Sequence, residues 1–122
     1  MFKKGEFMKK KKVGLVLGGG GGKGAYQVGV LKALEEHKIM KKVKYMSGTS
    51  IGAINMCVYL SGKTTNCELI WENIDKSFAL RKKSISQIIT QRSLFSSEGI
   101  IELANKYVDF KKIEKSKIKA LA

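Results

Sequence analysis

Proline is absent from this chain of 122 residues, and histidine, cysteine and tryptophan are scarce. The two cysteines, Cys57 and Cys67, are too far apart for a Cys-x-x-Cys pair, and the single histidine forms no cluster with them. The sequence therefore offers no metal site, and two free, buried thiols in a reducing compartment are the simplest expectation. No interdomain linker is marked, and the length suits one domain.

Long hydrophobic runs are also absent. The first apolar stretch, residues 13–17, reaches a run of glycines after five residues. That is too short for the core of a signal peptide and far too short for a transmembrane helix. Hydrophobic residues still make up 43% of the chain, enough for a core. We expect a cytoplasmic protein that at most contacts a membrane peripherally.

Acidic residues are few, because 10 Asp and Glu face 24 Lys and Arg, which gives a net charge of +14. Six lysines lie in residues 1–12, which we interpret as a basic lead-in to a domain at 13–122, and five lie in 111–119. This balance favours anionic surfaces such as phospholipid headgroups, although lysine-rich ends are more often solvated tails. Nucleic acid is not indicated as a partner, because aromatic residues do not interleave with the basic clusters and no nucleic-acid motif occurs.

Apolar periodicity predicts alternating strands and helices. Residues 13–17 and 43–46 are short apolar runs, typical of buried parallel strands, and residues 117–122 resemble the start of a third strand. Helices are predicted over residues 25–38, 52–60 (ended by Gly62), 67–80 and 98–107 (capped by Ser97). Expected core residues are Val28, Leu31, Leu34, Ile70, Trp71, Ile74, Phe78, Ile100, Ile101, Leu103 and Ala104. The alternation predicts the α/β class, a parallel sheet flanked by helices.

Six of the seven residues in 18–24 are glycine, and only Lys23 interrupts them. A glycine run between a strand and a helix lets backbone N–H groups approach an anion. A Walker P-loop is excluded, because Leu17 stands where the motif needs glycine and Gly24 follows the lysine instead of Ser or Thr. A dinucleotide fingerprint fits the glycines, but the next strand ends without the carboxylate it requires. An oxyanion hole for acyl transfer is the third interpretation.

The pentapeptide Gly48-Thr-Ser-Ile-Gly52 matches the G-x-S-x-G pattern and favours that third interpretation. A sharp strand-to-helix turn holds such a serine in a strained conformation, so its neighbours two before and two after must be small. The Ile51 N–H would begin the helix and point toward a developing oxyanion. Both loops follow adjacent parallel strands, so they should meet at one sheet edge. Ser50 is the predicted nucleophile; a serine that merely fills a tight turn is the alternative.

In combination, these motifs closely resemble the patatin-like phospholipase family. Residues 14–34, GLVLGGGGGKGAYQVGVLKAL, are similar to its opening block, 48–55 (GTSIGAIN) to its nucleophile block, and 93–110 more weakly to its next helical segment. The resemblance implies a three-layer α/β fold and a lipid acyl hydrolase of phospholipase A or lysophospholipase type, without metal or organic cofactor. It assigns the nucleophile to Ser50, the elbow to Gly48, Thr49 and Gly52, and the oxyanion hole to Gly19, Gly20, Gly21, Gly22, Lys23, Gly24 and Ile51.

A general base for Ser50 is harder to find. No histidine follows Ser50, which excludes the triad order of α/β-hydrolases, and His37 near the end of the first helix is expected at the surface. The family uses a Ser–Asp dyad whose Asp stands in an Asp-Gly-Gly or Asp-Gly-Ala motif. Neither Asp75 nor Asp109 matches that motif, and both are expected at the surface.

The resemblance therefore implies a base outside these 122 residues. We expect a fragment of a longer enzyme, ending at the start of its third strand, in preference to a natural short form without full activity. The alternative function is a non-catalytic basic module that binds acidic lipid through the glycine loop and the lysine-rich ends.

Overall fold

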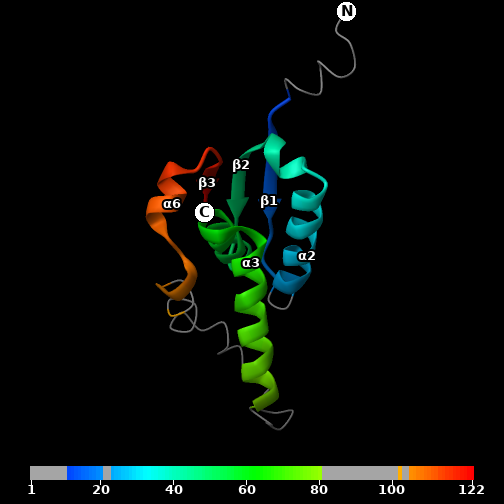
Figure 1. Ribbon diagram of the computed structural model, residues 1–122, viewed down its shortest axis with the longest axis vertical. Helices are drawn as coiled ribbons and strands as arrows, with labels where there is room; N and C mark the ends of the chain where they lie inside the picture. Colours follow the sequence, from blue (N-terminus) through cyan, green and yellow to red (C-terminus); the bar gives the residue numbers. More distant parts are fainter. Residues whose placement is uncertain (1–10, 21–22, 81–101, 103–104) are drawn as a thin grey trace, which may run out of the picture.

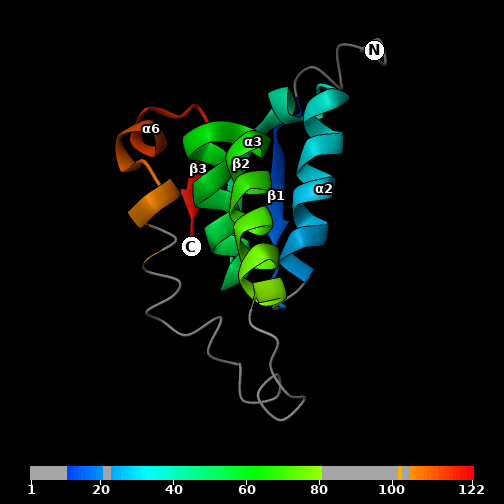
Figure 2. The same ribbon diagram turned by 60° about the horizontal axis from the view of Figure 1, so that its bottom comes forward.

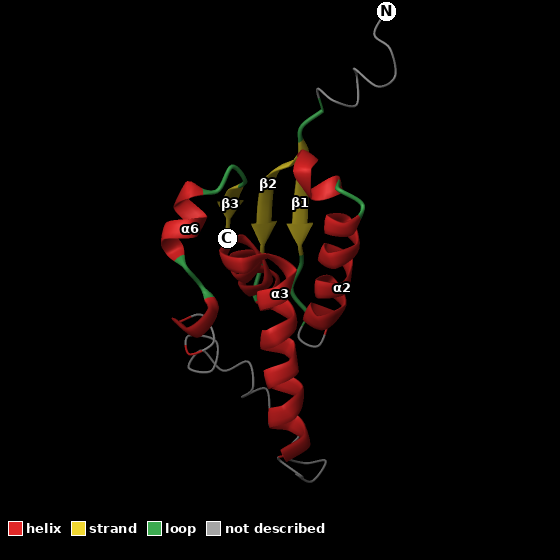
Figure 3. Ribbon diagram, viewed as in Figure 1, coloured by secondary structure: helices red, strands yellow, loops and turns green. Residues whose placement is uncertain are grey.

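The computed structural model describes residues 11–20, 23–80, 102 and 105–122. Its elements are strand β1 (Val13–Leu17), helix α2 (Lys23–Glu36), the 3-10 helix η1 (Ile39–Lys42), strand β2 (Val43–Gly48), helix α3 (Ile51–Leu80), helix α6 (Phe110–Lys115) and strand β3 (Lys119–Leu121). Figures 1 and 3 show the strands side by side, with the helices packed around them.

The described strands form one parallel sheet in the order β1-β2-β3. Leu15 pairs with Met46, which in turn pairs with Ala120 on β3. The predicted α/β class with a parallel sheet is therefore confirmed, and so is a strand near the end of the chain. Because all three strands run the same way, their carboxyl ends share one edge of the sheet.

Helices α2 and α3 cover one face of this sheet, with α3 in front of the strands in Figure 2. The buried apolar side chains are Leu17, Val28, Leu31, Met40, Val43, Met46, Ile51, Ile54, Met56, Val58, Tyr59, Cys67, Ile70 and Trp71. Each fully buried aliphatic side chain contributes about 2 kcal/mol. On the opposite face, Val16 and Leu121 are 74% and 73% exposed. The third layer that the resemblance implies is not among the described residues.

The first helix and the second strand are shifted from their predicted bounds. Helix α2 begins two residues early, at Lys23, and ends at Glu36. The end is early because Lys38 adopts a left-handed backbone (φ 61°) and leads into η1, which the sequence analysis missed. Strand β2 continues two residues past its predicted end, because its last residue, Gly48, still pairs with the end of β1.

The two predicted helices 52–60 and 67–80 are both present, as the two parts of α3. The helix is interrupted at Gly62 and Lys63, whose backbone angles are not helical, so the predicted stop at Gly62 is correct in position. A Cβ at Gly62 would lie 2.0 Å from the Asn66 amide nitrogen, so a larger residue at this bend would displace the Asn66 side chain. Val28, Leu31, Ile70 and Trp71 are buried as expected, and Leu34 is half-buried.

Most of the predicted helix 98–107, with Ser97 and its expected core residues, lies outside the described residues, as do the side chains of Ile74 and Phe78.

Helix α6 was not predicted. Asp109 caps it, because its carboxylate accepts hydrogen bonds from the Lys111 and Lys112 N–H groups. The Asp109 N–H donates to Ser61 Oγ (2.8 Å), and Asn73 of α3 donates to the Tyr107 hydroxyl. These contacts hold α6 beside α3 (Figure 1).

In the part of the chain that the structure describes, no helix is both long enough and apolar enough to cross a membrane.

Both cysteines carry free thiols. Cys67 is 1% exposed, and burial raises the pKa of its thiol to about 12, with Glu35 and Glu68 adding to the effect. Burial also raises the pKa of the half-buried Cys57. The expectation of buried thiols is confirmed for Cys67 and in part for Cys57.

The raised pKa predicts that Cys67 reacts slowly while the chain is folded. In a Cys57→Ser variant, iodoacetamide at pH 8 should alkylate Cys67 at least about 100-fold more slowly than in 8 M urea, because only the thiolate is nucleophilic. Intact mass spectrometry measures both rates. Equal rates would mean that Cys67 is not buried in the folded chain.

Candidate active site

Strand β2 leads directly into α3 through a tight turn at Ser50. Ser50 has a φ of 55°, and the left-handed region is uncommon for a residue with a side chain and costs about 1–3 kcal/mol. Three hydrogen bonds fix the turn: the Gly52 N–H donates to Thr49 O (3.0 Å), the Ala53 N–H to Ser50 O (2.9 Å), and the Thr49 N–H to Leu17 O (3.1 Å). The Ser50 residue itself is exposed. The predicted elbow therefore has a strained, solvent-facing serine at its centre.

Gly48 and Gly52 leave no room for side chains on either side of Ser50. A Cβ at Gly48 would lie 2.6 Å from Ala53 N, and one at Gly52 only 2.1 Å from Leu17 O. Both obstacles are backbone atoms, which cannot rotate away. The G-x-S-x-G spacing thus follows from the packing of the turn against α3 and against the end of β1.

The glycine loop lies against this turn. A Cβ built on Gly19 would be 3.3 Å from Ser50 Cβ and 4.0 Å from Ser50 Oγ, although the two residues are far apart in sequence. Figure 1 shows why: β1 and β2 point the same way, and each strand end leads into a helix, α2 or α3. Gly21 and Gly22 lie outside the described residues.

The backbone N–H groups near Ser50 divide into two sets. Among the described residues, those of Gly19, Gly20 and Ile51 donate no hydrogen bond to the backbone. The Lys23 N–H donates to Gly20 O (3.1 Å) and is engaged within the loop, while the Lys23 side chain is exposed. Because α2 begins at Lys23 and α3 at Ile51, two positive helix ends face the turn.

No base meets Ser50 in the described part of the chain, where its hydroxyl makes no side-chain hydrogen bond. His37 is exposed past the far end of α2, about 20 Å along the helix axis from the glycine loop. Asp109 is also exposed, and it contacts Ser61, which lies about 16 Å beyond Ser50 along α3. The surface placement expected for both residues is correct, and the side chain of Asp75 lies outside the described set.

A buried polar network behind the turn was missed by the sequence analysis. Asn55 is 2% exposed, and its amide donates to Gly24 O (2.9 Å) and to Gln27 Oε1 (3.0 Å). It also accepts a hydrogen bond from Trp71 Nε1 (3.1 Å). The available signal was an asparagine in the otherwise apolar segment 51–60, because a polar side chain there needs buried partners.

The fold and this site define an α/β protein with a G-x-S-x-G turn and a glycine loop at the carboxyl edge of a parallel sheet. The family model for patatin-like phospholipases matches residues 15–122, and the chain belongs to that family.

Among individual relatives, the lysophospholipase nte1 of Aspergillus terreus is 57% identical over 49 residues, or 40% of this chain and 3% of the relative. The lysophospholipase nte1 of Emericella nidulans is 63% identical over 41 residues, and NTE1 of Eremothecium gossypii 54% over 41, each 34% of this chain and 3% of the relative. The matches therefore span a small part of these much longer proteins. No solved structure gives a significant match.

The close approach at Gly52 predicts a large stability effect. Gly52→Ala should lower the free energy of unfolding by about 3 kcal/mol, because the added methyl group would overlap the Leu17 carbonyl. Urea unfolding followed by circular dichroism measures the change.

Gly29→Ala is the matched control, because Gly29 lies on the exposed side of α2 with no atom within 4 Å of the new Cβ. This variant should be more stable than the native chain by about 0.5–1 kcal/mol. Equal stability of the Gly52→Ala variant and the native chain would contradict the packing described here.

Proposed function

We propose that this chain supplies the nucleophile and the oxyanion hole of a lipid acyl hydrolase. The observation that carries the proposal is the close approach of Gly19 to Ser50, where a strained, exposed serine lies beside N–H groups that donate no hydrogen bond to the backbone. A serine that only filled a tight turn would not need a second loop of glycines packed against it. The membership of the patatin-like phospholipase family supports the same function.

In the proposed reaction, Ser50 Oγ attacks the carbonyl carbon of an acyl ester and its proton passes to a general base. The carbonyl oxygen becomes an oxyanion, which accepts hydrogen bonds from the N–H groups of Ile51, Gly19 and Gly20. Each such donor lowers the barrier by about 3 kcal/mol, because it is already oriented before charge develops. The intermediate collapses, the protonated alcohol leaves, and water then releases the fatty acid from Ser50.

Gly21, Gly22 and Gly24 have a supporting role in this proposal. They complete the loop that brings the donor N–H groups close to the substrate without side chains between them. Lys23 contributes through the positive potential of its side chain at the mouth of the loop, because its own N–H is engaged with Gly20.

We infer that the general base is an aspartate outside these 122 residues, as the family resemblance implies. The placement of His37 and Asp109 supports this inference, because both lie far along a helix from the turn. The chain by itself should then hydrolyse esters slowly, since a serine hydroxyl is a weak nucleophile until a base removes its proton.

Phospholipids and lysophospholipids are the proposed substrates. The relatives carry the name lysophospholipase, and the net charge of +14 would bring the chain to anionic headgroups. We therefore propose a cytoplasmic protein that contacts membranes peripherally.

A fluorophosphonate probe tests the role of Ser50 without requiring turnover. Ser50 Oγ should attack phosphorus and displace fluoride, adding one probe to the chain. If no base is present, the proton must pass to solvent, so the labelling rate should rise about tenfold per pH unit between pH 6 and 9. Intact mass spectrometry measures the rate, and peptide mapping locates the adduct.

Ser50→Ala should abolish labelling, whereas Ser47→Ala, which removes a serine from the preceding strand, should leave it unchanged. Labelling that persists in Ser50→Ala would remove Ser50 from the mechanism. A rate that reaches a plateau near neutral pH would place a base inside the chain. Binding to anionic phospholipid vesicles without any labelling of Ser50 would favour the non-catalytic lipid-binding module.

A further inference from the structure

The hydrogen bonds of Asn55 connect the nucleophile helix to the glycine loop. Asn55 lies on α3 little more than one turn beyond Ser50, and its amide donates to Gly24 O (2.9 Å) at the beginning of α2. The same amide donates to Gln27 Oε1 (3.0 Å), and Gln27 Nε2 donates to Gly18 O (2.6 Å). Gly18 and Gly24 are the two ends of the glycine loop. One buried side chain and its partner therefore contact both ends of that loop.

The direction of these hydrogen bonds is determined by chemistry at both ends. Trp71 Nε1 can only donate, so the Asn55 atom that faces it (3.1 Å) must be the oxygen. The Asn55 amide nitrogen then faces Gly24 O and Gln27, and both of these must accept. Gln27 accepts with its oxygen, which leaves its nitrogen to donate to Gly18 O. The donors and acceptors of the network are therefore fully matched. An aspartate at position 55 has the same shape as asparagine, but it would place a carboxylate oxygen against the Gly24 carbonyl oxygen.

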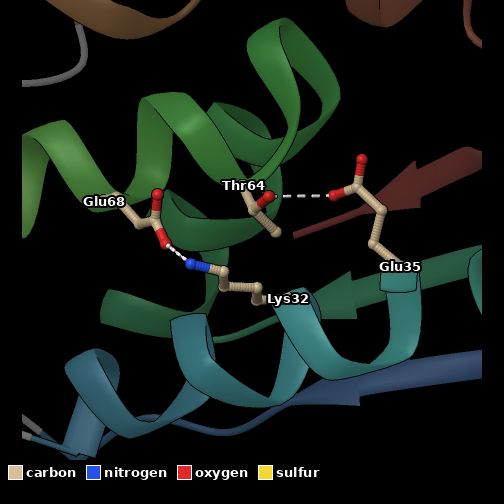
Figure 4. A network of polar contacts seen from close by, with 4 residues as sticks. All are labelled: Lys32, Glu35, Thr64 and Glu68. Atoms are coloured by element: carbon tan, nitrogen blue, oxygen red, sulfur yellow. Dashed lines mark hydrogen bonds and ion pairs between the residues drawn. The ribbon is translucent and has the colours of Figure 1, made fainter. Parts of the chain in front are cut away.

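Two further contacts, one exposed and one half-buried, join α2 to α3 without reaching the loop. Figure 4 shows Lys32 Nζ paired with Glu68 Oε1 (2.7 Å) and Thr64 Oγ1 donating to Glu35 Oε2 (3.0 Å). The Lys32–Glu68 pair is about half exposed, so solvent screens it and its contribution to stability is small. Pairing of the two helices is therefore supported at several points, whereas the loop is held at its two ends by the network of Gln27 and Asn55.

We propose that Gln27 and Asn55 are positioning residues that hold the glycine loop against Ser50 in the geometry that oxyanion binding requires. The proposal rests on the proposed function, because it assigns the loop to the oxyanion. Glycine residues allow the loop backbone many conformations. The proposal is that the side chains of Gln27 on α2 and Asn55 on α3 restrict this backbone to one of them. A displacement of the loop by 1 Å would separate the donors from the oxyanion.

Gln27→Met tests the proposal, because methionine has nearly the same length and lacks both polar atoms. The Gly18 end of the loop is then free, while Asn55 keeps its hydrogen bonds to Gly24 and Trp71. With a fluorophosphonate probe, the maximal rate of Ser50 labelling should fall about tenfold or more. The probe concentration for half-maximal labelling should change less than about twofold, because the loop acts on the developing oxyanion and little on the bound probe.

Hydrogen exchange of the Lys23 amide gives a readout that does not depend on labelling. Its hydrogen bond to Gly20 O lies within the loop, so its exchange rate by NMR should rise at least about tenfold in Gln27→Met. Thr64→Val is the matched control, because it removes a half-buried hydrogen bond between the same two helices away from the loop. It should leave both the exchange of Lys23 and the labelling of Ser50 unchanged.

The outcomes separate this proposal from the proposed function. If the native chain is not labelled at Ser50, the proposed function fails, and the exchange of Lys23 alone decides whether Gln27 restrains the loop. If labelling is normal in Gln27→Met, or if Lys23 exchanges at the native rate, the positioning role is overturned. Equal effects of Thr64→Val and Gln27→Met would also overturn it, because general pairing of α2 with α3 would then explain both.

Discussion

The site is built on the close contact between the beginning of α3 and the end of β1. Gly52 is so close to the Leu17 carbonyl that a Cβ would lie 2.1 Å from the oxygen, and the Thr49 N–H donates to the same oxygen. This contact fixes where α3 begins relative to the first strand. The serine two residues before Gly52 has a left-handed backbone in this turn, and the glycine loop begins directly after Leu17. The turn at Ser50 and the start of the glycine loop therefore meet at the Leu17 carbonyl.

Close backbone contacts of this kind explain which parts of the site could be predicted from the sequence. Backbone contacts at Gly48 and Gly52 forbid any side chain, so they leave a glycine pattern at fixed spacing that is visible without a structure. The first two strands were equally visible as short apolar runs, although their expected burial holds for one face only, because Val16 and Tyr45 are exposed. The break at Gly62 could be predicted because glycine is a common end of helices.

Other features have no such local signature. Lys38 and Lys63 adopt left-handed backbones that lysine does not favour, so only the surrounding packing determines them. Helix α6 is six residues long, and its one signal was an aspartate in the capping position, Asp109. The network of Asn55, Gln27 and Trp71 joins three separate segments of sequence, and its members are identified as partners only when α2 and both parts of α3 are packed together.

The same network sets a limit on how the loop can be stabilised. An apolar residue at position 55 would leave the Trp71 N–H without its acceptor and the Gly24 carbonyl without the hydrogen bond from Asn55, at a cost of about 1–3 kcal/mol for each buried group left unpaired. An asparagine is tolerated in the core because it uses both amide hydrogens and its oxygen there. The core of this protein therefore does more than exclude water. Through Asn55 it connects α3, which the Gly52 contact places against β1, to a glycine loop in which Lys23 is the one residue with a side chain.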